Sequence, residues 1–243
     1  MSDKHSLDSL SRKLYPSTRL AIPPHHSTFP ELTAAITDLR LHPTIEAALH
    51  LLNSDLPSAH FLVRHMQAPP AVEGMLLHGI LHRAEGDFDN SRAWISDVKD
   101  ACEGFQPKKK DEGQKLDQGI SDKTRSGTGV EQTLVEYVYG ASEPSELIDD
   151  VEAFRKKKGS QRGEKEEEQL EERSREELRL VIEWCKVKFG AAEWMDATKA
   201  WEKNSEEISK ISGDMIVMSA GNHQEQLSEE RSSESSRAMP DGR

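Results

Sequence analysis

The sequence predicts an all-α protein, an irregular bundle of short amphipathic helices with one long helix and disordered tails. Apolar residues recur at the spacing of one helix face through most of the first hundred residues. Prolines stand just before several of these segments, where a proline costs no helical hydrogen bond. Only 35% of the 243 residues are hydrophobic and 31% are charged, so part of the chain cannot bury enough apolar surface to order itself.

Three short helices are expected end to end at the start of the core. The segment "STFPELTAAITDLR" offers Thr28 as a cap, and apolar residues follow at the spacing of one face. The same spacing recurs after Pro43 and again after Pro57. The connections between these three segments are expected to be tight.

The fourth helix is predicted to be the most buried. Its sequence, "AVEGMLLHGILHRAEG", is apolar on almost all sides, and Gly86 is expected to end it. Asp87 can then cap a fifth helix, in which one face carries small and apolar residues at Ser91, Ile95 and Val98.

The second half of the chain predicts further helices. Apolar spacing in residues 130–140 favours a short helix, with a strand as the alternative because of the β-branched residues there. Residues 142–154 favour another short helix, and residues 164–189 predict one long helix. The charged N-terminal half of the long helix is expected to project into solvent and its C-terminal half to dock on the core. Trp194 and Trp201 are seven residues apart and predict a last helix packing by one face.

These segments divide the chain into five parts. The prediction is a disordered arm over 1–27, a helical core with a histidine-rich hairpin over 28–102, a disordered linker over 103–129, C-terminal helices over 130–205, and a disordered acidic, serine-rich tail over 206–243.

Composition limits the classes of partner and compartment. The net charge of -12 argues against nucleic-acid binding, which draws on clustered Lys and Arg. No apolar run approaches the roughly 20 residues of a membrane span, and the first residues lack a signal-peptide apolar segment. The two cysteines, Cys102 and Cys185, suit reduced thiols better than a disulfide framework. A cytoplasmic or nuclear protein is expected, with no membrane contact and with a protein partner as the open possibility.

A polar stripe on the buried fourth helix is the candidate site. His78 and His82 are about 40° apart in helical projection, and Glu85 falls on the same side. If the preceding helix folds back antiparallel, His60 or His65 could face this stripe. The candidate residues are His78, His82, Arg83, Glu85, Asp87 and Asn90.

Three interpretations of the stripe remain open. His78 and His82 with a carboxylate could bind zinc or non-haem iron. The same residues could form a metal-free acid-base or polar binding site. They could also be a structural network, since a buried histidine needs only one or two hydrogen bonds and charged residues lie close by. The metalloprotease pattern H-E-x-x-H is absent, and no nucleotide-binding or nucleophile motif suggests another cofactor.

Two resemblances rest on the same hairpin. Residues Gly79 to Val98, with the "GDF" turn, resemble one tetratricopeptide unit, although His82 stands where an aromatic residue is usual. The pattern "LHxxxHRxEGDxxNxxxW" from residue 77 to Trp94 is similar to that of a poorly characterised group of fungal and bacterial proteins. The first resemblance implies a helical hairpin, and the second supports the helical core and the choice of site residues. The sequence thus favours a partner-binding or accessory protein. The alternative is a small enzyme that uses His78, His82 and Glu85, with or without a metal, for hydrolysis or acid-base chemistry.

Overall fold

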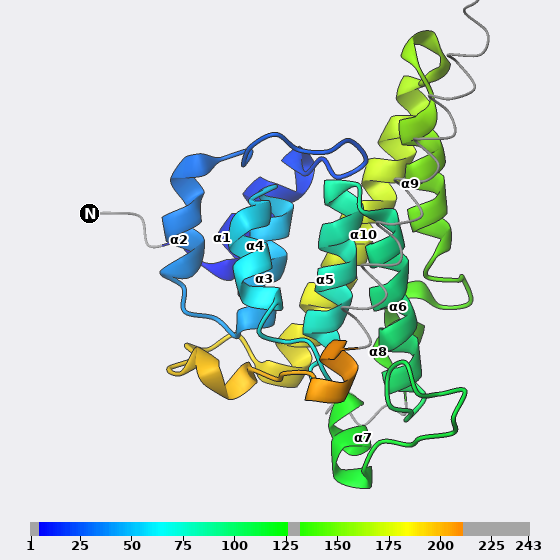
Figure 1. Ribbon diagram of the computed structural model, residues 1–243. Helices are drawn as coiled ribbons and strands as arrows, with labels where there is room; N and C mark the ends of the chain where they lie inside the picture. Colours follow the sequence, from blue (N-terminus) through cyan, green and yellow to red (C-terminus); the bar gives the residue numbers. More distant parts are fainter. Residues whose placement is uncertain (1–4, 126–131, 211–243) are drawn as a thin grey trace, which may run out of the picture. The chain divides into compact units, whose positions relative to one another are not determined.

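The computed structural model describes residues 5–125 and 132–210, and these residues form helices joined by turns and loops, with no strand among them. Residues Met1–Lys203 make one compact unit, and Asn204–Arg243 make a second, of which residues 204–210 are described. The α-helices of the first unit are α1 (Leu7–Leu14), α2 (Thr33–Thr37), α3 (Pro43–Leu52), α4 (Leu56–Val63), α5 (Val72–Glu85), α6 (Phe88–Cys102), α7 (Gln118–Thr124), α8 (Leu134–Tyr139), α9 (Glu146–Lys156) and α10 (Glu164–Phe189). The predicted all-α fold is confirmed (Figure 1).

The described part of the N-terminal arm is ordered, which corrects the prediction of disorder over 1–27. Ser6 and Ser9 form a reciprocal capping box at the start of α1. Three leucines at spacings of three and four, Leu7, Leu10 and Leu14, are buried in the core. The helix was not predicted because polar residues separate these leucines in the sequence. Residues 1–4 lie outside the described residues.

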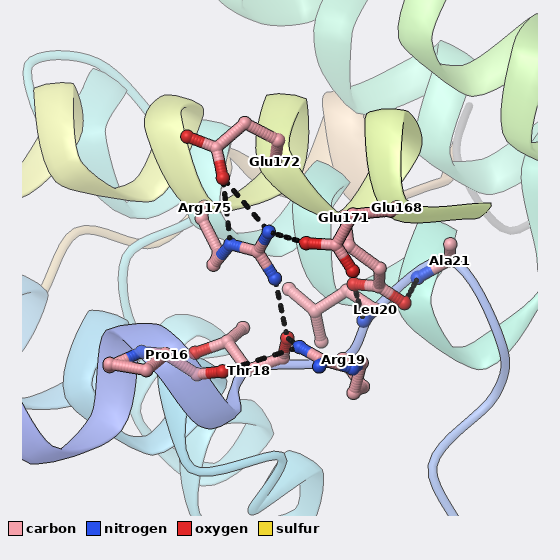
Figure 2. A network of polar contacts seen from close by, with 9 residues as sticks. All are labelled: Pro16, Thr18, Arg19, Leu20, Ala21, Glu168, Glu171, Glu172 and Arg175. Carbon is pink, nitrogen blue, oxygen red and sulfur yellow. Dashed lines mark hydrogen bonds and ion pairs between the residues drawn. The ribbon is translucent and has the colours of Figure 1, made fainter. Parts of the chain in front are cut away.

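Glu171 of α10 fixes the chain that follows α1. Its carboxylate accepts the backbone N–H groups of Leu20 at 2.7 Å and Ala21 at 2.9 Å. Figure 2 shows Arg175 beside it, donating to the Thr18 carbonyl and to two other glutamates of α10. Glu171 and Arg175 therefore both bind the backbone of the arm.

The short helices α2 to α4 follow the proline positions. α3 begins at Pro43 as predicted, and Asp55 caps α4 by accepting the N–H of Ser58 at 3.3 Å. The first helix of the set is shorter than its apolar spacing suggests, because a 3-10 turn over Pro30–Leu32 precedes α2. Thr28 does not cap it; its backbone N–H binds the Asn53 carbonyl instead.

The hairpin of α5 and α6 is built as the sequence predicts. Gly86 ends α5 with a φ of 98°, and the Asp87 side chain accepts the N–H of Asn90 at 3.2 Å. A Cβ on Gly79 would lie 3.3 Å from the Cβ of Trp94, so the glycine allows the two helices to approach closely. Figure 1 shows them side by side along most of their lengths.

The long helix α10 docks earlier than predicted. Only its first turns, up to residue 169, are exposed on most sides, whereas Leu170, Glu171, Ser174 and Glu177 are buried. Leu170 packs with residues of α9, including Val151 and Phe154. The charged sequence conceals this face because two of its buried residues are glutamates with partners inside the protein.

Two loop regions differ from their predictions. The expected linker over 103–129 contains α7 and an isolated bridge between Phe105 and Lys115, while residues 126–131 lie outside the described part. After α10 there is a short 3-10 turn, Ala197–Ala200, in place of the expected last helix. Of the predicted disordered tail, residues 206–210 are helical and 211–243 are outside the described residues. Within the described ranges, no helix is long and apolar enough to cross a membrane.

Candidate functional site

Three histidines from two consecutive helices meet at one point of the core. His60 lies on α4, and His78 and His82 lie one turn apart on α5. Each offers one ring nitrogen, and these three atoms all lie within 4.8 Å of one another. The expectation that α4 could bring His60 to the stripe is confirmed, because the turn between the helices folds α4 back on α5.

The rings form a stack with one ring across it. His78 lies between Trp94 of α6, at a centroid distance of 4.3 Å, and His82, at 4.8 Å. His60 meets both histidines edge-on, at 5.3 and 5.7 Å. His78 and His82 are buried and His60 is half-buried, so the cluster lies just beneath the surface.

His82 is held by a partner at each ring nitrogen. Its Nδ1 lies 3.1 Å from Oε2 of Glu85, and its Nε2 lies 3.1 Å from the Asn90 side-chain amide. A carboxylate can only accept, so Nδ1 carries the proton and Nε2 accepts from Asn90. This is the tautomer in which Nε2 has its lone pair free for a metal once Asn90 moves aside.

The other two histidines have no hydrogen-bond partner among the described residues. The Nδ1 atom of His78 is fully buried without one, and neither ring of the pair donates to or accepts from a described group. Burying an imidazole nitrogen without a partner costs about 1–3 kcal/mol. The two rings therefore keep lone pairs available for a ligand that is not part of the chain.

Burial favours the neutral form of the His78 and His60 imidazoles. Burial lowers the pKa of His78 to about 3, and the neighbouring charges of His82 and His60 add to this effect. Burial also lowers the pKa of His60, although Glu85 opposes the shift. Because a metal binds only the deprotonated ring, a depressed pKa suits a ligand.

The donor set fits a borderline transition metal. Nitrogen atoms bound to one tetrahedral zinc ion lie about 3.3 Å apart. Side-chain rotations that move each ring nitrogen by roughly 1 Å would therefore bring the three nitrogens to this distance. Three imidazoles leave a fourth position for water or substrate, as in catalytic zinc sites. Glu85 would orient His82 from behind.

The remaining predicted residues divide into two groups. Glu85 and Asn90 lie in the cluster through His82, as expected. Asp87 caps α6, and its second oxygen lies 3.4 Å from the Asn90 amide, so it supports the site without reaching a histidine. Arg83 does not belong to the site, because its side chain binds Glu177 of α10 instead of a histidine.

Arg83 instead binds Glu177 of α10 inside the core. Its NH1 donates to Oε1 at 3.0 Å and its NH2 to Oε2, and Tyr139 of α8 donates to the same carboxylate at 2.6 Å. Arg83 follows His82 directly, and one residue along an α-helix turns the side chain by about 100° around the axis. This turn separates Arg83 from the three-histidine cluster. The sequence could not show this, since Glu177 looked like one more residue of a charged run.

Trp94 belongs to the site but was not among the predicted site residues. It was placed beside the apolar face of the fifth helix, and its ring instead covers His78. The signal was its position in the hairpin, opposite Gly79. Comparison of the chain with protein-family models, with curated proteins and with solved structures gives no match.

Proposed function

We propose that this protein binds a divalent transition-metal ion, zinc by preference, through the imidazoles of His60, His78 and His82. The observation that carries the proposal is the convergence of three ring nitrogens within 4.8 Å, two of the rings having no hydrogen-bond partner among the described residues. A structural network would have supplied those partners.

The reaction class that such a site supports is metal-assisted hydrolysis. A zinc ion held by three imidazoles lowers the pKa of a bound water to near 7 and polarises a carbonyl or phosphoryl oxygen. His60 is only half-buried, so the fourth position can face the solvent side. The small-enzyme alternative drawn from the sequence is thus the one favoured here.

Metal analysis with matched variants tests the proposal. The purified chain is saturated with zinc, desalted and measured for zinc per chain. We expect one equivalent in the unchanged protein and at least a hundredfold weaker binding in His60→Ala, His78→Ala and His82→Ala. His26→Ala removes an exposed histidine and serves as the control.

Folding must be separated from binding in these variants. His60 is half-buried, so His60→Ala is the variant least expected to unfold, and its circular dichroism should match that of the unchanged chain. Unchanged zinc content in a folded His60→Ala protein would refute the three-histidine site.

A partner-binding role is the second candidate, and a separate surface favours it. Phe61, His65 and Trp201 form an aromatic row in which His65 stacks on Trp201 at 4.5 Å and meets Phe61 at 5.2 Å. Phe61 is 53% exposed and Trp201 38%. Exposed aromatic residues of this kind are typical of protein interfaces.

Site-specific cross-linking tests this second role. A photoreactive phenylalanine at position 61 should capture one protein, and that protein, once purified, should bind the unchanged chain at least tenfold more tightly than the Phe61→Ser/Trp201→Ser variant. Equal binding to both would exclude this surface.

We further propose a reducing compartment, the cytoplasm or nucleus. Both cysteines are free and buried, and burial raises the pKa of both thiols, so neither suits redox exchange. The tetratricopeptide likeness stays a hypothesis about the α5 and α6 hairpin alone.

A further inference from the structure

A second feature of the molecule is a pocket of about 390 Å³ between the start of α5 and the end of α10. Ala71 and Glu73 line it from α5 and the residues before it, Lys188 and Phe189 from α10, and Trp194 from the segment that follows. Ligand sites in proteins commonly have this size. The three-histidine cluster is not part of its lining.

A buried carboxylate forms part of the wall and is only half satisfied. Oε1 of Glu73 accepts the Trp184 indole N–H at 2.8 Å and the Lys188 amine at 2.6 Å. Its Oε2 atom is buried and has no hydrogen-bond partner in the part of the chain that the structure describes, and the residue is 0% exposed. Since Lys188 already balances the charge, the free oxygen calls for a neutral N–H or O–H donor rather than a cation.

A donor without an acceptor lies in the same wall. The indole Nε1 of Trp194 is buried and has no partner among the described residues. Beside it the ring of His42 stacks on Phe189 at 3.7 Å and meets Trp194 edge-on at 4.6 Å. Burial lowers the pKa of His42 to about 4, and the charge of Lys188 adds to this, so this wall is flat, aromatic and neutral.

The remaining lining includes three exposed cations and two acidic residues, Asp122 and Glu202. Lys123 and Arg125 come from the end of α7 and Lys199 from the 3-10 turn, and none of the three forms an ion pair with a described residue. Cations left unpaired beside a pocket favour an anionic group on its ligand.

We infer that this pocket binds a nucleoside monophosphate. The edge of a nucleobase such as guanine or uracil presents an N–H beside a C=O, which matches the free oxygen of Glu73 and the free N–H of Trp194. The flat base suits the aromatic wall, and the phosphate suits the cations. The pocket is partly open and its lining carries charges of both signs, which suits a mononucleotide. A polymer would need an extended basic surface, and the net charge of -12 argues against one.

Calorimetric titration of the full chain tests the inference with defined probes. GMP, UMP and AMP are the ligands, and guanosine, inorganic phosphate and 4-hydroxybenzoate are the comparisons. We expect one site per chain for GMP or UMP, at least tenfold weaker binding of AMP, whose base lacks the carbonyl, and at least tenfold weaker binding of all three comparisons.

Two variants assign the site. Lys123→Ala/Arg125→Ala/Lys199→Ala changes only exposed side chains and should weaken the nucleotide at least tenfold, most strongly at low salt. Glu73→Gln should also weaken nucleotide binding at least tenfold, although it leaves the cations near the phosphate unchanged. Lys165→Ala is the control, because this exposed cation lies at the other end of α10, about 35 Å away by helical rise.

Several results would overturn the inference. These are no heat with GMP or UMP, equal binding of AMP or 4-hydroxybenzoate, and unchanged affinity in the triple variant. The nucleotide inference is independent of the metal proposal. The His60→Ala variant should bind the nucleotide with the same affinity as the unchanged chain.

Discussion

At the scale of single residues, His78 decides how the site responds to pH. Its pKa is lowered to about 3, mainly by burial, while an unfolded chain carries an ordinary histidine of pKa about 6.5. Between these values the unfolded state binds a proton that the folded state does not. Lowering the pH through this window therefore destabilises the metal-free fold.

Replacing this ring tests the pH effect. His78→Phe keeps a flat ring beside Trp94 but cannot titrate, so its unfolding free energy should fall less steeply from pH 6 to pH 4, by about 1.4 kcal/mol per pH unit. The measurement is urea unfolding in the presence of a chelator. Parallel slopes for the two proteins would show that His78 is not buried in its neutral form.

Asn90 is expected to compete with the metal. Its amide donates to Nε2 of His82, the atom a metal would use. Asn90→Ala removes a hydrogen bond worth about 1 kcal/mol, so zinc affinity should rise about fivefold. Asp89→Ala, an exposed change on the same turn, should leave it unaltered, and a weaker zinc affinity in Asn90→Ala would contradict this arrangement.

At the scale of elements, the packing of α5 depends on small residues where neighbouring backbone comes close. A Cβ added to Gly74 would lie 2.3 Å from the Cβ of Met66, a distance that requires the backbone to shift. Gly74→Ala should therefore lower the unfolding free energy by about 1–3 kcal/mol. A Cβ on Gly119 of α7 would meet nothing within 4 Å, so Gly119→Ala should leave the unfolding free energy unchanged or raise it slightly. Thermal melts of both variants measure the two effects.

The helices show how far sequence patterns reach. α3 begins at Pro43, α5 ends at Gly86 and α6 begins after Asp87, as the sequence indicates, because those signals act through the local backbone. α1 was missed because its three buried leucines lie among polar residues. The helix expected around Trp194 is absent, since that backbone N–H binds the Arg40 carbonyl at 2.6 Å instead. Such tertiary contacts override local spacing.

At the scale of the whole first unit, buried ion pairs join parts that are distant in sequence. Arg83 of α5, Tyr139 of α8 and Glu177 of α10 meet in one network, with Arg83 only 1% exposed. Arg83→Met should cost about 3–5 kcal/mol, because it leaves the Glu177 charge buried. Arg92→Met breaks a partly exposed pair with Asp149 and should cost about 1 kcal/mol or less in chemical unfolding.

The candidate site was predictable only in part, because some of its neighbours come from parts of the chain that are distant in sequence. His78, His82 and Glu85 share a helix face, so their spacing alone brought them together. Arg83 was misplaced because its partner is 94 residues away. The pocket that includes Glu73 and Trp194 had no sequence signal, since its residues come from segments whose meeting depends on the tertiary fold.

Cobalt titration tests the central claim most directly, since Co²⁺ enters zinc sites and its visible absorption reports the geometry of its ligands. We expect intense d–d bands that saturate at one Co²⁺ per chain, disappear on adding zinc, and are lost in His60→Ala while remaining in His26→Ala. No bands at saturating cobalt, or bands that persist in a folded His60→Ala protein, would contradict the metal site formed by His60, His78 and His82.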